Sequence, residues 1–201
     1  MREEIIRLGG EFLFHSQVTD ILPKENCLIV NGCHRIETDA AVFAVGHSAR
    51  DTFQMLFDRN VAMKSKSFAI GVRAEHRQDM IDEAMYGRKE RGPLGAAAYK
   101  LTAQLENGRG VYTFCMCPGG YVVNASSEQG RLAVNGMSYH DRAGENANSA
   151  VIVTVTKDDY GSDHPLAGME FQRRLEKRHG KKAAAMFRYN DLPISAQGQY
   201  Q

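Results

Sequence analysis

Short stretches of alternating apolar and polar residues make up the first part of the chain. Residues 2–8 have the spacing of a helix, and Gly9-Gly10 ends it because glycine commonly terminates helices. The alternation then predicts short strands over residues 11–14, 17–22, 27–30 and 33–36. Asn31-Gly32, between the last two, is a strong signal for a tight hairpin turn. The pattern therefore predicts an antiparallel meander.

A continuous apolar run, AAVFAV at residues 40–45, follows the meander. Such a run is typical of a strand buried on both faces, as at the centre of a parallel sheet. Gly46 ends the run, and Ser48 is placed to cap a helix over residues 49–58. The sequence therefore predicts a buried strand that leads directly into a helix.

The rest of the chain alternates between strand-like and helix-like patterns. Strands are predicted over residues 66–76, 99–105, 110–116, 121–125, 132–135 and 150–156. Helices are predicted over residues 78–86, ended by Gly87, and 166–179, ended by Gly180. Asn107-Gly108 turns one pair of strands into a hairpin. The strands outnumber the helices and are short, so the predicted fold class is α+β, rich in antiparallel strands.

The charge balance and the apolar runs narrow the classes of protein to which the chain can belong. Lys+Arg 25 against Asp+Glu 24 leaves no excess of positive charge for a broad nucleic-acid or membrane surface. No apolar run approaches the roughly 20 residues that span a bilayer. The charged N-terminus lacks the apolar centre of a signal peptide. We therefore expect a cytoplasmic protein that binds neither nucleic acid nor a membrane.

The predicted buried strand at residues 40–45 is the first candidate site. A glycine after such a strand lets a ligand approach the backbone closely, and in doubly wound folds cofactors bind at this edge. Ala44, Gly46 and His47 would lie at that edge. An ordinary buried strand followed by a glycine turn explains the same residues without a ligand.

Two neighbouring thiols form the second candidate site. Cys115 and Cys117 are two residues apart along a predicted strand, just before the turn Pro118-Gly119-Gly120. Because side chains alternate between the two faces of a strand, both thiols would lie on one face. A redox role is one interpretation, although a disulfide across one residue is strained. Packing of two small residues is the other. The two glycines would let a flat ring or a substrate approach the turn.

A polar stretch at residues 134–148 is the third candidate site. Its density of hydrogen-bonding groups indicates a polar loop, in which Tyr139 or His140 could donate a proton to a substrate. A solvated loop held by Asn and Asp turns is the alternative. Nothing fixes a metal geometry among its side chains, so no metal site is predicted. Arg73 and His76, on the strand at 66–76, are expected at an exposed strand end rather than in a cleft.

Motifs that bind pyrophosphate are missing from the sequence. It contains no Gly-x-Gly-x-x-Gly fingerprint, since Gly108 and Gly110 lack the third glycine, and it contains no P-loop. The chain alone is therefore not expected to hold the pyrophosphate of FAD or NAD.

Two resemblances connect these motifs to flavoproteins. The meander followed by TDAAVFAVG looks like the closing strand of the nucleotide-binding domain in glutathione-reductase-like flavoproteins, which would place Ala44, Gly46 and His47 beside FAD. The strings CMCPGGYV and NGMSYHDRAGENANSA, with three further segments, resemble the bacterial FAD-dependent dehydrogenases. These are NAD(P)/FAD-dependent oxidoreductases of largely uncharacterised function. The further segments are residues 48–56, 66–76 and 165–176.

The resemblance implies a domain organisation. Members of the family are longer and carry the glycine fingerprint before the region that matches this chain. Residues 1–60 would be part of a doubly wound FAD-binding domain, including its meander and closing strand. Residues 61–165 would be an inserted substrate or cap domain, and residues 166–201 a return helix and tail. The chain is then expected to be the central fragment of a flavin-dependent oxidoreductase, and to be inactive alone.

The resemblance also implies a cofactor and a chamber. FAD would be the cofactor and NAD(P) a second one, with hydride transfer at the flavin and an unknown small-molecule substrate. Residues 115–120, including Pro118, Gly119 and Gly120, would line the chamber together with residues 138–145. The alternative is a self-contained small-ligand-binding or structural module without catalysis. A fragment would expose apolar surface around residues 40–45 and could self-associate through it, whereas a module would stay monomeric.

Overall fold

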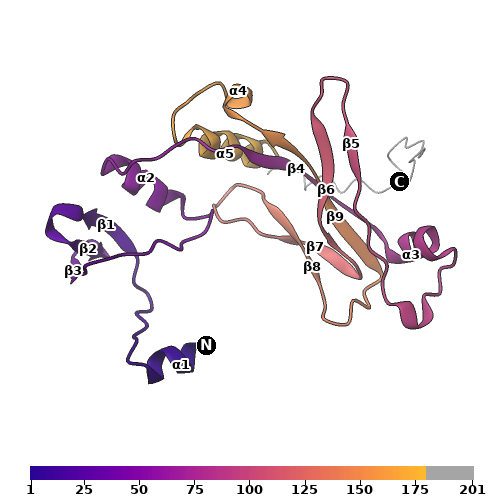
Figure 1. Ribbon diagram of the computed structural model, residues 1–201, viewed down its shortest axis with the longest axis horizontal. Helices are drawn as coiled ribbons and strands as arrows, with labels where there is room; N and C mark the ends of the chain where they lie inside the picture. The colour runs from indigo at the N-terminus through magenta and orange to yellow at the C-terminus, as the bar shows by residue number, and fades with distance from the viewer. Residues whose placement is uncertain (180–201) are drawn as a thin grey trace. The chain divides into compact units, whose positions relative to one another are not determined.

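The computed structural model describes residues 1–179 and divides the chain between Lys64 and Ser65 into two compact units, each considered by itself below (Figure 1). The predicted helix end Gly180 and the tail to Gln201 lie outside the described residues. In the described part, no helix has the length and apolar character needed to cross a membrane.

A small antiparallel sheet forms the centre of the first unit. Its elements are α1 (Arg2–Arg7), β1 (Val18–Leu22), the 3-10 turn η1 (Pro23–Glu25), β2 (Cys27–Val30), β3 (His34–Glu37) and α2 (Arg50–Asp58). The strands pair antiparallel in the order β1-β2-β3, which confirms the predicted meander. The turn residues Asn31 and Gly32 both have positive φ, as the hairpin signal requires.

Side chains from this sheet and from α2 hold the first unit together. Ile21, Cys27 and Val30 are its buried apolar side chains. Arg59, directly after α2, donates through Nε to Asp20 of β1 at 2.6 Å. A second link joins Gln17 to the Asp51 carboxylate of α2 at 2.6 Å.

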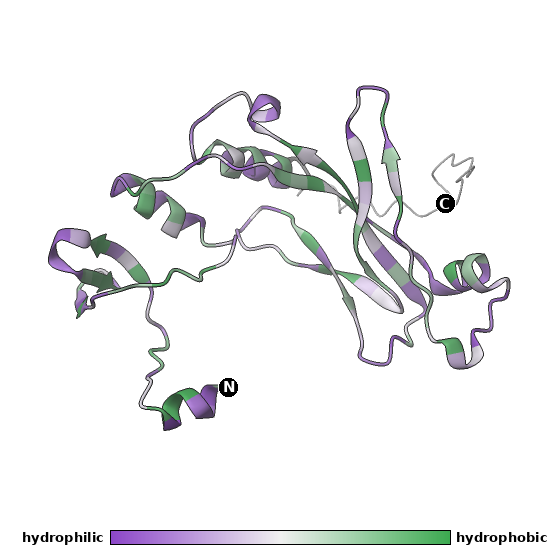
Figure 2. Ribbon diagram, in the orientation of Figure 1, coloured by the Kyte–Doolittle hydropathy of each residue, from purple (hydrophilic) through white to green (hydrophobic). Residues whose placement is uncertain are grey.

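Two predicted strands of this unit are wrong. Residues 11–14 form no strand, and residues 40–45 form no strand either but an extended segment outside the sheet, shown in Figure 2. Val42 is 92% exposed. An apolar run forms a buried strand only where neighbouring strands hydrogen-bond to it and other elements cover its faces. No strand among the described residues pairs with residues 40–45. The cap also differs, because Ala49 is the N-cap of α2 and makes no side-chain hydrogen bond.

A four-stranded antiparallel sheet dominates the second unit. Its elements are β4 (Phe68–Arg77), α3 (Gln78–Tyr86), the 3-10 turn η2 (Gly92–Leu94), β5 (Thr102–Gln104), β6 (Gly110–Cys117), β7 (Gly120–Asn124), β8 (Val134–Ser138), β9 (Asn146–Val155), α4 (Lys157–Tyr160) and α5 (Ala167–His179). The sheet order is β4-β9-β6-β5, and β7 pairs with β8 in a separate hairpin. These antiparallel sheets and helices confirm the α+β class. The doubly wound layer and the three-part domain assignment stay predictions.

The long pairing between β4 and β9 separates two faces of this sheet. It runs through ten residue pairs, from Phe68 with Val155 to Arg77 with Asn146, so successive side chains point to opposite faces. On the face of Phe68, the rings of Tyr160 and Phe171 lie 6.1 and 6.4 Å from its ring. Arg73 points to the opposite face, against the β7–β8 hairpin.

Candidate functional site

A buried guanidinium lies at the centre of the face beneath the hairpin. Arg73 of β4 is only 8% exposed, and its Nη1 donates to Oδ1 of Asn148, a fully buried residue of β9. Both Nη atoms also donate to the backbone carbonyl of Cys115, each at 3.1 Å. Nη1 lies 3.7 Å from the Cys117 sulfur. The guanidinium therefore links three strands of the sheet.

The sequence prediction of Arg73 at an exposed strand end is wrong. The hairpin covers this residue because position 136 is glycine. A Cβ there would overlap both the Arg73 guanidinium and the Asn148 amide oxygen. The alternation of side chains along β4 determines on which face of the sheet Arg73 lies. Whether that face is buried depends on the β7–β8 hairpin, which is distant in sequence.

Glu75 fastens the hairpin to the same face. One oxygen of its carboxylate accepts from the backbone N–H of Val122 in β7 at 2.6 Å, and the other accepts from the Asn146 amide at 2.7 Å. A buried or half-buried carboxylate is stable only when such donors replace water. Glu75 thus joins β4 to β7 and β9, whereas Arg73, two residues away, joins β4 to β9 and β6.

The two candidate thiols lie on an irregular part of β6. The pairing with β9 shifts by one residue between Phe114 and Cys117, and Cys115 has a left-handed φ of 46°. The sequence predicts both thiols on one face of a regular strand. This bulge interrupts the regular alternation on which that prediction depends. Cys115 is exposed and Cys117 half-buried, and both are free thiols.

The turn Pro118-Gly119-Gly120 packs against the chain itself. Gly119 has a φ of 56°, and its N–H donates to the buried Oε1 of Gln78 at 2.8 Å. A Cβ at Gly119 would overlap the carbonyl oxygen of Arg142, and one at Gly120 would overlap that of Met137. Close packing against the backbone of this chain therefore explains why glycine is required at positions 119 and 120. A cofactor contact by Pro118, Gly119 or Gly120 stays a prediction.

A buried amide–carboxylate pair at the start of α3 supports this turn. Gln78 and Asp82 are each 1% exposed, and Nε2 of Gln78 donates to Oδ1 of Asp82 at 2.7 Å. The same oxygen accepts from the N–H of Ala97 at 2.8 Å, while Oδ2 lies 3.2 Å from Nε of Arg91. The sequence predicts the helix correctly, but its motifs do not identify Gln78 and Asp82 as functional or buried residues. Their spacing of four residues on one helix face was the available signal.

A half-buried pair joins His76 to Tyr99. The His76 Nε2 and the Tyr99 hydroxyl are 2.7 Å apart. Burial lowers the pKa of His76 and raises the pKa of Tyr99, since both charged forms lose their hydration. The neutral pair, with the hydroxyl donating to Nε2, is therefore the favoured state. Sequence reasoning did not single out Tyr99.

The polar stretch at 134–148 is divided between strands and a short loop. Asn146 and Asn148 belong to β9, so the predicted loop is shorter than expected. Tyr139 and His140 do lie in the loop, and Tyr139 is 71% exposed. In the described part of the chain, neither side chain has a hydrogen-bond partner. Both remain available to a ligand, and their catalytic role stays a prediction.

The candidate residues near the apolar run belong to the first unit. Gly46 has a φ of 71°, and nothing lies within 4 Å of the position of a Cβ there. Ala44 and His47 are exposed, with His47 Nε2 3.4 Å from the Ser48 hydroxyl. These residues offer open backbone but no enclosed cradle. The described residues alone therefore do not fit the pyrophosphate of FAD.

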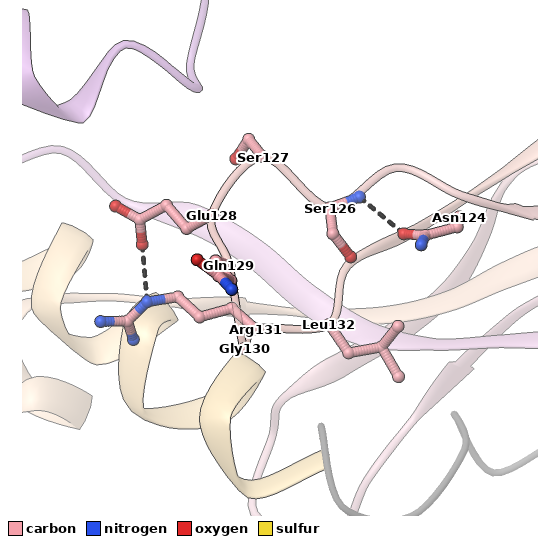
Figure 3. Close-up of a pocket in the computed structure, with 8 residues that line it drawn as sticks. All are labelled: Asn124, Ser126, Ser127, Glu128, Gln129, Gly130, Arg131 and Leu132. Carbon is pink, nitrogen blue, oxygen red and sulfur yellow. Dashed lines mark hydrogen bonds and ion pairs between the residues drawn. The ribbon is translucent and has the colours of Figure 1, made fainter.

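An open, polar hollow lies in the loop between β7 and β8 (Figure 3). Its volume is about 550 Å³, and its lining residues are Asn124, Ser126, Ser127, Glu128, Gln129, Gly130, Arg131 and Leu132. Glu128 pairs with Arg131 at 2.7 Å and with Arg173 of α5 at 2.7 Å. The Glu128 carboxylate raises the pKa of Arg173, so this pair keeps its charge. These contacts fix the loop against α5.

Comparison with known proteins places the second unit in a described group. A family model described as FAD-dependent protein, C-terminal domain-like matches residues 67–195. A protein from Clostridium beijerinckii, described as an uncharacterized protein, is 54% identical over 181 residues. The match covers 88% of this chain and 34% of that protein. The chain thus spans about a third of the length of the relative that it matches.

Proposed function

The chain belongs to the FAD-dependent protein, C-terminal domain-like family, and from this membership we propose that it is a central part of a flavin-dependent oxidoreductase. The observation that carries the proposal is the match over residues 67–195, which includes nearly all of the described second unit. FAD would supply hydride transfer in the longer protein. NAD(P) is a second cofactor to test, and the substrate is a small molecule.

The residues of this chain would shape the chamber rather than hold the pyrophosphate. Glu75 fixes the β7–β8 hairpin to the sheet, and the hairpin covers Arg73. Tyr139 and His140, exposed after β8, are the candidates for proton donation to a substrate. Cys115, exposed on its bulge, is a third group that a substrate could meet.

Catalysis by this chain alone is not expected. The sequence has no glycine fingerprint, and the described residues form no enclosed cradle for FAD. The exposed run at residues 40–45 would pair with further strands in a longer protein, or with a second copy in self-association.

One observation favours a second candidate function. The hollow of about 550 Å³ is lined by hydroxyl and amide side chains and by one ion pair. Such a surface suits a small, polar, hydrogen-bonding ligand. A ligand-binding module without catalysis would use this hollow and would need no flavin.

Anaerobic reduction of the longer relative tests the oxidoreductase proposal. The Clostridium beijerinckii protein is purified, its visible flavin absorption is recorded, and NADH or NADPH is added. We expect bound flavin that one of the two nicotinamides bleaches. Flavin that neither reduces overturns the role of NAD(P). A relative that contains no flavin and does not take up added FAD overturns the proposal itself and leaves the ligand-binding module.

A further inference from the structure

Arg73 is a buried cation without a carboxylate partner in the described part of the chain. In the described residues, its acceptors are the amide oxygen of Asn148, the carbonyl of Cys115 and the sulfur of Cys117. Buried charges are usually paired, because desolvation of an isolated charge is costly. Of these three acceptors, only the Cys117 sulfur can carry a negative charge.

From this arrangement we propose that Cys117 is a site of oxidative modification, at which a hydroperoxide converts the thiol to a sulfenic acid. Arg73 is the positioning residue for this reaction, since its Nη1 lies 3.7 Å from the sulfur. Cys117 is half-buried, so a molecule as small as hydrogen peroxide can reach a thiol that is still surrounded by protein. The proposal uses residues of this chain only and does not depend on FAD.

The chemical step balances with the hydroperoxide as the oxidant. The sulfur attacks one peroxide oxygen, the S–O bond forms and the O–O bond breaks. Sulfur is oxidised by two electrons, both peroxide oxygens are reduced, and the thiol proton ends on the leaving oxygen, which departs as water from hydrogen peroxide or as an alcohol from an organic hydroperoxide. A guanidinium beside the sulfur stabilises the negative charge that passes to the leaving oxygen, as oxyanion donors do.

A second buried group supports an oxygen on this sulfur. Nδ2 of Asn148 is buried and has no hydrogen-bond partner in the described part of the chain. Asn148 stands directly across the strand pair from Cys117. Leaving a buried donor unsatisfied costs about 1–3 kcal/mol. We expect this amide to donate to the sulfenic oxygen, which would stabilise the modified form.

The neighbouring thiol, Cys115, lies on the bulge of β6. Arg73 holds the Cys115 carbonyl with both Nη atoms, and the left-handed φ of Cys115 turns the chain at this point. Cys115 is exposed and could consume the sulfenic acid by forming a disulfide. The test therefore uses a Cys115→Ser variant, in which the product of the first step accumulates.

Chemical trapping in the folded 201-residue chain tests the proposal. The Cys115→Ser protein is treated with hydrogen peroxide and a dimedone-type trap, and mass spectrometry follows the label on each cysteine. Cys33 is the internal control, because it is exposed and its thiol has no partner in the described part of the chain. We expect Cys117 to be labelled about tenfold faster than Cys33. Equal or slower labelling of Cys117 overturns the proposal.

Variants and unfolding separate the role of Arg73 from a merely structural one. Arg73→Lys should retain part of the rate advantage and Arg73→Met should lose it, whereas Arg59→Met, which removes an exposed ion pair, should leave it unchanged. If Arg73→Met does not fold, the ratio of Cys117 to Cys33 labelling is compared between the folded parent protein and the same protein unfolded in urea. A ratio of Cys117 to Cys33 labelling that stays the same in urea contradicts the proposal.

Discussion

In the sheet of the first unit the buried side chains are Ile21, Cys27 and Val30, whereas the long β4–β9 pair of the second unit buries the polar Arg73, Asn148 and Ser149 as well as the apolar Ala147 and Val155. The first unit also leaves apolar residues outside its sheet, with Val42 92% exposed. The second unit buries polar groups beside its apolar ones, and in the described residues these polar groups are almost all hydrogen-bonded. A polar interior of this kind is a poor source of stability and a common feature of functional sites.

The two units should therefore be sensitive to substitution at different kinds of position. At Gly119, Gly120 and Gly136 of the second unit, other atoms already occupy the space that a Cβ would need. In the first unit, much of the chain around residues 40–47 borders open space. Matched substitutions in the two units should therefore have very different effects.

A pair of glycine substitutions makes the strongest contrast. Gly119→Ala places a Cβ onto the backbone carbonyl of Arg142 and should lower the free energy of unfolding by about 3 kcal/mol or more. Gly46→Ala meets no atom within 4 Å and should cost only about 1 kcal/mol, from its left-handed φ. Urea unfolding followed by circular dichroism measures both. Equal losses would contradict the contrast.

Removal of one arginine from each unit gives the next largest effect. Arg73→Met leaves the Asn148 amide oxygen and the Cys115 carbonyl without their donor, and we expect a loss of about 3 kcal/mol. Arg59→Met removes an exposed ion pair with Asp20 and should cost much less stability, because surface ion pairs contribute little. The same unfolding measurement checks both, and a larger loss for Arg59→Met would refute the comparison.

The pH dependence of stability should reveal the half-buried His76. Burial lowers its pKa in the folded protein, so the unfolded chain binds its proton at higher pH than the folded one does. The contribution of His76 is therefore fully present above the unfolded pKa of about 6.5 and is lost as the pH falls below it. Thermal unfolding from pH 8 to pH 5 measures this loss. His76→Gln should make the curve flatter there, and an unchanged curve would contradict the assignment.

The exposed run should give the smallest effect on stability and a clear effect on association. Val42→Lys changes a side chain that contacts little, so the free energy of unfolding should change by about 0.5 kcal/mol or less. The added charge should reduce hydrophobic dye binding and self-association, because it interrupts the apolar surface. Light scattering and dye fluorescence measure both. Undiminished association would place the contact elsewhere.

Local signals in the sequence were sufficient for much of the fold. The helix predicted at 78–86 is α3, Gln78–Tyr86, because Gly87 ends it with a left-handed φ. Asn31-Gly32 and Asn107-Gly108 both mark hairpins that the structure contains. These features depend on residues close together in sequence, so pattern and turn chemistry determine them.

The candidate site was less predictable because distant residues form it. Burial of Arg73 depends on Gly136 of another hairpin, and the partner of His76 is Tyr99 from a separate segment. The bulge at Cys115 breaks an alternation that the sequence alone does not interrupt. The strand predicted at residues 40–45 is wrong for another reason. Its apolar pattern predicts neighbouring strands on both sides, and no strand among the described residues pairs with it.

The flavin content of the longer relative and of this chain decides whether the chain is part of a flavoprotein. The Clostridium beijerinckii relative and this 201-residue chain are purified in parallel, incubated with FAD, desalted and denatured, and the released flavin is quantified. The account predicts about one FAD per molecule of the longer relative and none on the chain alone. A relative that releases no flavin would contradict the assignment to a flavin-dependent oxidoreductase, and FAD retained by the chain alone would contradict its inability to hold the cofactor.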